Sequence, residues 1–206
     1  MNKVISLLIL SVMLLSSVVP AQEISTVSES RKKNIMIQLD YRYKGGFYSF
    51  EKLFNQHVTY PEVLQKNCIM GIVIVSFIVN CDGVLTDFSI KNPIHASINE
   101  QLANLFDLTQ GQWNECKDDK YSRFEIPIQF RISDVETNTE DAVFVCETDT
   151  PGYVCNDDDY YLKKAEKLLE KGNGKKARKY IDVLIKRDPY NIHYNEMRKE
   201  SLELIK

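Results

Sequence analysis

The stretch that decides the fold is "YPEVLQKNCIMGIVIVSFIVNCDGVLTDFSI", residues 60–90. Residues 71–80 predict a β-strand, because apolar side chains recur at every second position and so share one face. Asp82-Gly83 predicts a two-residue hairpin loop, because a type I′ turn requires positive φ at both central positions. The stretch therefore predicts two antiparallel strands joined by a tight turn, with no obvious catalytic group nearby.

The predicted turn sets the pairing of the hairpin. With Asp82 and Gly83 as the loop, the facing pairs are Cys81 with Val84, Val79 with Thr86, Phe77 with Phe88, and Val75 with Ile90. This register brings the large side chains of both strands, including Val73, to one face. The opposite face is mixed, and three of its residues are either covered by other elements or form an association surface: Ile72, Ile74 and Ile78.

Two short helices are expected before the first strand. Residues 22–46 are polar and basic and indicate a leader or a loosely attached strand. The stretch "SFEKLFNQH", residues 49–57, has apolar residues at helical spacing. Pro61 suits the first position of a second helix that runs to about Lys66, because proline lacks only an N–H group that the first turn leaves unpaired.

A helix and a third strand are expected after the hairpin. Ser97 and Glu100 fit a capping box at the start of the helix. Trp113 follows it and is expected to fill the core rather than to stack on a ligand. "YSRFEIPIQFRI", residues 121–132, alternates between apolar and polar side chains and predicts a strand. Pro127 cannot donate to a central ladder, so this strand is expected at a sheet edge, with Pro127 facing away from its neighbour.

These elements predict a small α+β domain over residues 47–133, with a three-stranded antiparallel sheet and helices packed on it. Their order resembles the C-terminal domain of the TonB family. The residues that carry the resemblance are Tyr60 and Pro61, Gly71 at the start of the first strand, Asp82 and Gly83 in the turn, Trp113, and the strand "IPIQFRI".

The resemblance implies protein–protein contact in the periplasm. In TonB itself, an extended segment of an outer-membrane transporter pairs with the third strand, so that backbone hydrogen bonds supply affinity and alternate side chains supply specificity. On this sequence the corresponding edge is residues 123–132. The resemblance therefore implies an outer-membrane or periplasmic protein as partner, a link to TonB-type transport, and these partner-binding residues: Arg123, Glu125, Pro127, Gln129 and Arg131.

The first 21 residues predict a signal peptide. A short cationic start is followed by an apolar run from Val4 to Leu15, and small side chains precede the expected cleavage after Ala21. The alternative is an uncleaved anchor, which would make the protein an anchored TonB-like energy transducer. Such a transducer also needs a long proline-rich linker, whereas residues 22–46 form a short stretch that contains no proline. A periplasmic binding or adaptor role is therefore favoured.

Export changes how the five cysteines are interpreted. Disulfides persist in an oxidising compartment, and an odd count leaves at least one thiol free or paired between chains. Cys146 and Cys155 flank the turn signal Pro151-Gly152, which predicts one bridge within a connecting loop over residues 134–159. The alternative is two unpaired thiols. No metal is expected, because no C-x-x-C occurs and the three histidines are scattered.

Residues 160–206 predict a helical segment that resembles a tetratricopeptide repeat. The residues at the repeat's offsets are Ala165, Ala177, Ile181, Leu184 and Pro189, with Gly172 and Gly174 in the turn. A further helix is expected from Tyr190 to Ile205, with Tyr194, Met197, Leu202 and Ile205 packed inward. The alternative is a generic helical hairpin. Because one repeat buries little core alone, it must dock on the first domain, pair with another chain, or remain marginal.

Composition and motifs favour a binding protein over an enzyme. A net charge of −3 over 206 residues offers no general attraction to nucleic acid. No nucleophile, phosphate-binding or dinucleotide motif is present, and Asp157-Asp158-Asp159 precedes a helix, where acidic groups suit the helix dipole. We therefore expect no cofactor and no small-molecule substrate. The alternative function is a self-associating structural envelope protein, a homodimer formed through the outer face of the first hairpin.

Overall fold

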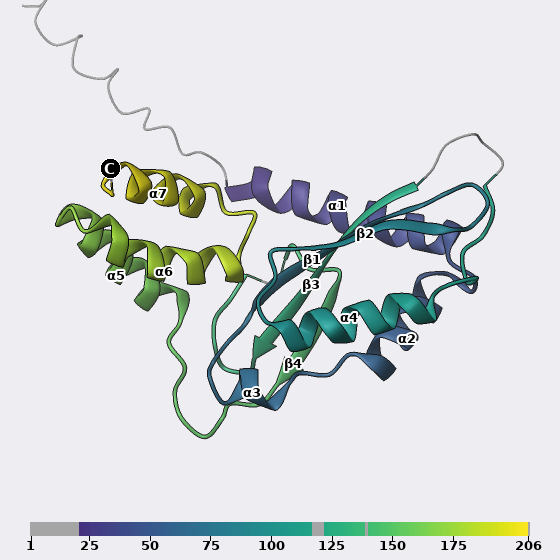
Figure 1. Ribbon diagram of the computed structural model, residues 1–206, viewed down its shortest axis with the longest axis horizontal. Helices are drawn as coiled ribbons and strands as arrows, with labels where there is room; N and C mark the ends of the chain where they lie inside the picture. Colours follow the sequence, from purple (N-terminus) through teal and green to yellow (C-terminus); the bar gives the residue numbers. More distant parts are fainter. Residues whose placement is uncertain (1–20, 117–121, 139, 206) are drawn as a thin grey trace, which may run out of the picture.

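The computed structural model describes residues 21–116, 122–138 and 140–205. The predicted signal peptide, residues 1–21, lies outside the described part of the chain except for Ala21, the first residue of α1. Figure 1 shows a sheet with α2 and α4 on one side and three C-terminal helices gathered near one end. The elements in chain order are α1 (Ala21–Arg42), α2 (Gly46–His57), α3 (Glu62–Gln65), β1 (Gly71–Val79), β2 (Leu85–Lys91), α4 (Ala96–Leu108), β3 (Ser122–Ile132), β4 (Phe144–Thr148), α5 (Asp158–Glu170), α6 (Gly174–Arg187) and α7 (Ile192–Glu203).

The sheet has four strands in the order β2-β1-β3-β4. β1 pairs antiparallel with β2 and with β3, whereas β4 pairs parallel with β3. The structure confirms the α+β class and corrects the three-stranded antiparallel sheet to a four-stranded mixed sheet. The fourth strand lies within residues 134–159, which were predicted as a connecting loop.

The hairpin loop between β1 and β2 is longer than the predicted two residues. The N–H of Gly83 donates to the carbonyl of Asn80 at 3.0 Å, and the N–H of Asn80 donates to the carbonyl of Val84 at 2.9 Å. Gly83 is the last residue of the loop and has a φ of 80°, the left-handed conformation that three-residue hairpin loops use at this position. The predicted pairing of Cys81 with Val84 is therefore wrong by one residue, because Asn80 takes the place of Cys81.

A β-bulge in β2 restores the predicted register farther along the hairpin. Asp87, at φ 53°, and Phe88 together lie opposite the single residue Phe77. An extra residue on one strand moves the pairing by one position. The error at the turn is thereby cancelled, and the observed pairs are Val79 with Leu85, Ile78 with Thr86, and Val75 with Ile90, of which only the last was predicted.

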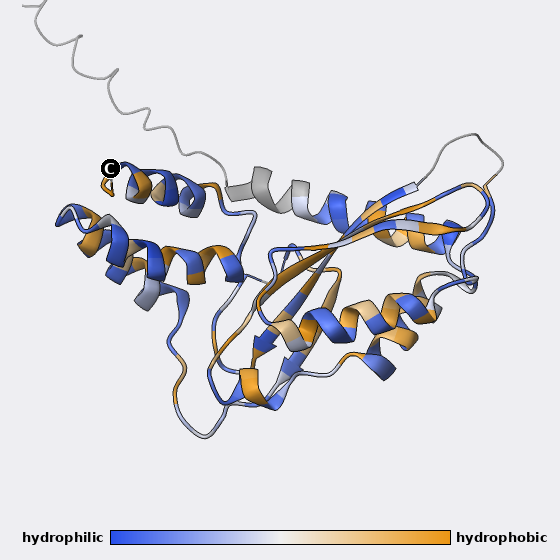
Figure 2. Cartoon of the chain, in the orientation of Figure 1, coloured by the Kyte–Doolittle hydropathy of each residue, from blue (hydrophilic) through white to orange (hydrophobic). Residues whose placement is uncertain are grey.

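One face of the sheet carries the main core, beneath α2 and α4. The ring of Phe77 stacks on that of Phe124 with centroids 4.8 Å apart, and Trp113 contacts both. Trp113 is buried, as expected, and its Nε1 donates to Thr109 Oγ1 at 3.1 Å. Figure 2 shows the apolar residues concentrated on the strands. The predicted inward row of β1 is confirmed as buried: Val73, Val75, Phe77 and Val79.

The opposite face of β1 is also buried. Ile72, Ile74 and Ile78 are each less than a tenth exposed, so these residues do not form the open association surface that was one of the two expectations. α6 contacts β1 here. A Cβ on Gly71 would lie 2.2 Å from the carbonyl oxygen of Lys186, so only glycine lets the end of α6 approach the first residue of β1 this closely.

Residues 22–46 do not form the expected leader or loose strand. They form most of α1, which packs against β3 and brings Ile35 and Leu39 into the main core. Arg42 is 1% exposed and donates to Ser122 Oγ at 2.6 Å and to two backbone carbonyl groups. Because Arg42 and Ser28 share the buried side with the apolar residues, the sequence shows only a weak amphipathic pattern.

The other helices of the first domain begin close to where they were expected. Pro61 is the N-cap of α3 rather than its first residue. α4 begins after His95, whose ring Nδ1 accepts from the N–H of Ser97 at 3.2 Å. The predicted capping box of Ser97 and Glu100 is therefore wrong, because His95 holds the N-cap position two residues earlier. His95 accepts from the N–H of Ser97, the donor that the Glu100 side chain was expected to satisfy.

α5 and α6 form the predicted helical hairpin. Its small and apolar residues Ala165, Ala177, Ile181 and Leu184 are fully buried in a second core. Gly174 is the first residue of α6 rather than part of the turn. A Cβ there would lie 2.2 Å from the carbonyl oxygen of Ser201, so the glycine permits close contact between α6 and α7.

α7 packs on this hairpin, but not with all of the expected residues. Tyr194 and Met197 are buried, as predicted. Leu202 and Ile205 are 42% and 46% exposed, and Ser201 occupies the buried position instead. The prediction was wrong because the buried stripe of α7 runs through residues 194, 197 and 201, so Leu202 lies beside it, and Ile205 follows the end of the helix at Glu203.

The C-terminal helices dock on the first domain, which was one of the three expected fates of a single repeat. Asn92 Nδ2 donates to the carbonyl of Ile72 at 2.6 Å and to that of Lys186 at 3.1 Å. Asn138 Nδ2 donates to Asp188 Oδ2 at 3.1 Å. These bonds join the end of α6 to the sheet and to the loop before β4.

Candidate protein-binding edge

β3, which was predicted at the sheet edge, lies inside the sheet. Residues 122–130 pair with β1, and residues 128–132 pair with β4. Pro127 lies just before the first β3–β4 pair, and its carbonyl accepts from the N–H of Val143 at 2.8 Å. The proline does face away from β1, but the edge assignment is wrong, because a strand can tolerate proline where its second neighbour has not yet begun.

The side chains predicted to bind a partner share the sheet face opposite the main core. Gln129 is 1% exposed, and its Nε2 donates to Thr137 Oγ1 at 3.1 Å. Arg123 and Glu125 are exposed. Pro127 is buried, and Arg131 is half-buried. The structure therefore brings the five to one face but leaves only part of the set accessible.

Two of these side chains are held by ion pairs within the sheet. Glu125 pairs with Lys91 of β2, and Arg131 pairs with Glu147 of β4. Hydrogen bonds from Ser133 and Arg131 lower the pKa of the Glu147 carboxyl below its ordinary value. Both pairs are partly exposed, so they contribute little to stability and mainly fix the orientation of the side chains.

β4 provides an open edge that sequence reasoning missed. The N–H of Ser133 donates to the carbonyl of Thr148 at 2.8 Å, so the backbone of Thr148 faces β3. Because successive residues of a strand point their backbone groups to opposite sides, Val145 and Glu147 direct theirs away from β3. Within the described residues, no backbone hydrogen bond outside the ladder occupies these groups. Val145 is 39% exposed.

The signal that could have found β4 is the alternation in "VFVCET", residues 143–148. Phe144 and Cys146 enter the core, whereas Val145 and Glu147 lie on the outside. The run is short and is bracketed by turn residues, so the pattern alone does not distinguish this strand from a loop.

The first three residues of the family resemblance have structural roles. The hydroxyl of Tyr60 donates to the carbonyl of Ile69 at 2.7 Å, and burial raises the pKa of Tyr60. Pro61 caps α3, and Gly71 accommodates the end of α6. None of the three lies at the outer edge of β4.

The other three residues meet at the far end of the hairpin. Asp82 Oδ1 accepts from the N–H of Val84 at 3.0 Å, which stabilises the loop. A Cβ on Gly83 would lie 2.7 Å from the carbonyl oxygen of Trp113. These residues line an open hollow of about 760 Å³ with mixed polar and apolar walls. The six residues therefore support the fold and do not converge on one site.

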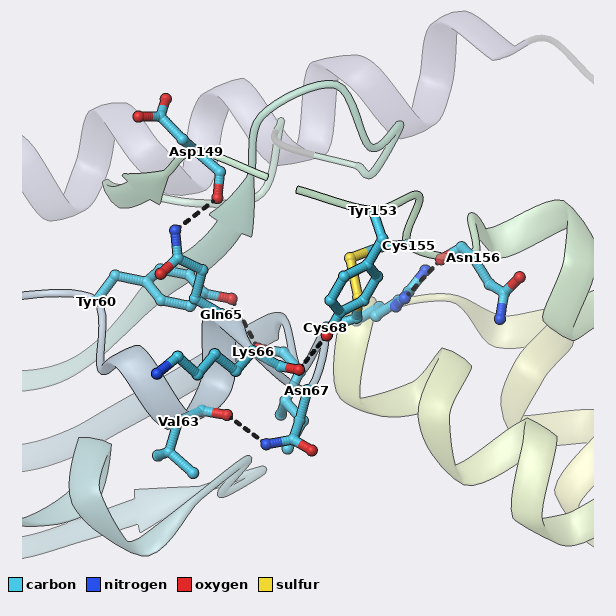
Figure 3. Close-up of a disulfide and its surroundings, with 12 residues drawn as sticks. Tyr60, Val63, Gln65, Lys66, Asn67, Cys68, Asp149, Tyr153, Cys155 and Asn156 are labelled. Carbon is cyan, nitrogen blue, oxygen red and sulfur yellow. Dashed lines mark hydrogen bonds between the residues drawn. A yellow bond between two sulfur atoms is a disulfide. The ribbon is translucent and has the colours of Figure 1, made fainter. Parts of the chain in front are cut away.

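The disulfides differ from the predicted one. Cys68 pairs with Cys155, with Cα atoms 5.6 Å apart, and Cys81 pairs with Cys116. Figure 3 shows the Cys68–Cys155 bridge between the end of α3 and the segment that leads to α5. The predicted bridge between Cys146 and Cys155 is wrong, because Cys146 belongs to β4 and its side chain points into the main core.

Hydrogen bonds tie the two segments together around this bridge. The hydroxyl of Tyr153 donates to the carbonyl of Lys66, and Gln65 Nε2 donates to the carbonyl of Asp149 at 2.9 Å. Both bonds are visible in Figure 3. The bridge is thus one part of a broader contact between α3 and the chain that follows β4.

Cys146 is a buried free thiol, and burial raises its pKa to about 11. Alkylation requires the thiolate, so near pH 8 only about a thousandth of this thiol would be reactive even with access. We expect no adduct after brief iodoacetamide treatment of the folded protein near pH 8. In concentrated guanidinium without reductant, where the pKa returns to about 8.5, we expect one adduct by intact-mass spectrometry.

A Cys146→Ala variant is the control and should take up none under either condition. An adduct on the folded protein would contradict the buried position of Cys146. More than one adduct in guanidinium would contradict the two disulfides.

A second hollow, of about 390 Å³, lies beside the start of α5 and is largely acidic. Asp157 Oδ1 accepts from the N–H of Tyr160 at 2.8 Å and caps α5. Burial raises the pKa of Asp158, against the opposing hydrogen bond from Arg187. In the described part of the chain, no group of three or more potential ligands is placed to hold a metal ion. The lining residues are Glu136, Thr137, Asn138, Asp157, Asp158 and Asp159.

Comparison with known proteins adds no relative. No protein-family model, curated protein or solved structure matches the chain. Among the described helices, none is both long and apolar enough to cross a membrane. The two disulfides are consistent with an oxidising extracellular or periplasmic compartment.

Proposed function

We propose that this protein is an exported, non-enzymatic binding module of the bacterial envelope that resembles the TonB C-terminal domain. It binds an extended segment of an outer-membrane or periplasmic protein at the outer edge of β4. The observation that carries the proposal is the outward orientation of the backbone groups of Val145 and Glu147. An extended peptide can add to such an edge through main-chain hydrogen bonds.

The binding position differs from the one that the resemblance implied. The place beside residues 128–132 of β3 is filled by β4 of the same chain. An added segment therefore lies one strand farther out, beside β4. Val145, with its exposed side chain, and Glu147, paired with Arg131, then contact alternate residues of the segment.

The helical segment and the disulfides support a stable scaffold for this edge. α5–α7 dock on the sheet, and we propose that they act as a tetratricopeptide-like support rather than as a separate mobile domain. The Cys68–Cys155 bridge holds the chain just beyond β4 against α3. A link to TonB-type transport follows if the bound segment belongs to a transporter.

The test is affinity capture from a periplasm and outer-membrane extract with the mature chain and two variants. Val145→Pro removes the outward N–H group, whereas Val145→Thr has nearly the same shape and keeps it. We expect the wild type and Val145→Thr to retain an envelope protein identified by mass spectrometry. We expect Val145→Pro to bind it at least about tenfold more weakly, through one lost hydrogen bond and the bulk of the ring.

Thermal unfolding of both variants checks that the sheet is intact. Equal capture by all three proteins, with equal thermal midpoints, would remove the outer edge of β4 as the binding site. That result would contradict the proposal that an extended peptide adds to β4.

A further inference from the structure

The other edge of the sheet, β2, is open as well. Within the described residues, β1 is its sole neighbouring strand. Pro127 faces away from β1, so its partner Ile74 directs its backbone groups toward β2. Lys91, which pairs with Ile74, therefore faces β1, and the adjacent Ile90 directs its N–H and C=O outward. This edge is independent of β4, which lies on the far side of the sheet.

The side chains along β2 form two rows. The apolar row is only partly buried, although it packs against the main core, and consists of Leu85, Phe88 and Ile90. Asp87 and Lys91 are exposed and carry opposite charges. Lys91 is paired with Glu125, whereas Asp87 makes no ion pair with the described residues. The edge thus combines incompletely buried apolar surface with an unused carboxylate.

We propose that β2 pairs antiparallel with β2 of a second copy of this chain, around a two-fold axis at Ser89. In this arrangement Asp87 of each copy faces Lys91 of the other, so the same attractive pair occurs twice. Phe88 and Ile90 of the two copies also face each other and complete the burial of the apolar row. The two four-stranded sheets join into one continuous sheet.

Charge favours this register over those with the axis two residues away. An axis at Asp87 would bring two carboxylates together, and an axis at Lys91 would bring two ammonium groups together. A second copy carries the complementary charge at each of these facing positions, whereas an arbitrary strand does not.

The test is the mass of the purified mature chain in sedimentation velocity across a wide range of concentrations. We expect a monomer–dimer equilibrium for the wild type. Asp87→Lys turns both attractive pairs into repulsive ones and should raise the dissociation constant about tenfold. The double variant with Asp87→Lys and Lys91→Asp exchanges the charges, and we expect it to restore most of the wild-type affinity.

The rescue separates charge from folding. Asp87 has a left-handed φ, in which lysine is less favourable than aspartate, and both the single and the double variant carry lysine there. Glu200→Lys makes the same charge change on an exposed position of α7 and should leave the dissociation constant unchanged. A wild type that stays monomeric at all concentrations would overturn the proposal, as would an Asp87→Lys variant that dimerises normally.

The dimer does not depend on the function proposed for β4. We expect Val145→Pro to dimerise like the wild type, and Asp87→Lys to capture the envelope protein like the wild type. Loss of capture with an intact dimer would therefore concern β4 alone, and loss of the dimer with intact capture would concern β2 alone.

Discussion

Replacing Cys68 and Cys155 together by serine is expected to lower the free energy of unfolding by about 4–5 kcal/mol. The bridge joins residues 87 positions apart, and a cross-link over so long a loop removes much of the conformational freedom of the unfolded chain. The measurement is urea unfolding under non-reducing conditions, so that the Cys81–Cys116 bridge is kept. The slope of the transition should rise, because the unfolded chain without this cross-link is more expanded and exposes more surface.

Cys146→Ala is the matched control for this experiment, because it removes a cysteine and leaves both bridges in place. We expect it to lose only about 1 kcal/mol, the usual scale for a small change in a core. A loss of less than about 1 kcal/mol in the double serine variant would contradict the stabilising role assigned to the Cys68–Cys155 bridge.

Phe144→Ala is expected to destabilise the protein by about 3–5 kcal/mol, the usual cost of removing a buried aromatic side chain. Phe144 is 3% exposed, and its ring stacks on that of Phe54 with centroids 4.9 Å apart and on that of Phe47 at 5.5 Å. Val145→Ala in the same strand removes an exposed side chain and should cost less than about 1 kcal/mol. Urea unfolding of both variants measures the difference.

This difference bears directly on the binding edge. If Phe144→Ala cost as little as Val145→Ala, β4 would be only loosely attached and could leave β3. Residues 128–132 would then become available to a partner, as the resemblance to TonB implied. The expected large cost instead makes β4 a permanent part of the sheet and places the binding edge on its outer side.

The sequence predicted the parts of the fold that depend on local patterns. The apolar run in β1 and the alternation in β3 identified both strands and the face of each that joins the main core. The hairpin was found, but Asp82-Gly83 alone could not show that the loop begins one residue earlier. The compensating bulge at Asp87 also leaves no mark in hydropathy, because a polar residue is equally ordinary in a regular edge strand.

The parts that could not be predicted depend on contacts between distant residues. β4 follows a short pattern, and its parallel pairing with β3 is set by the packing of Phe144 under α2. The helix α1 was missed because Ser28 and Arg42 occupy its buried side. Nearness in sequence suggested a bridge between Cys146 and Cys155, but strand alternation turns Cys146 inward and leaves Cys155 for Cys68.

The position of the binding edge also depends on contacts between residues that are distant in sequence. Pro127 correctly indicated that β3 has no paired strand on one side at residue 127. It could not indicate that the pairing with β4 begins at the next residue, Ile128. The side chains expected to contact a partner therefore share one sheet face, with Gln129 fully covered. The open edge at β4 could be identified only once the order of the four strands was known.

The position of the Cys68–Cys155 bridge has a mechanical consequence. All four strands and α4 lie between the two cysteines in sequence. A pulling force applied through the chain on either side would pass directly from α3 to the segment before α5 by way of the sulfur atoms. The sheet would carry none of that tension along its backbone, and both of its open edges would keep their shape while the helices on either side are under load.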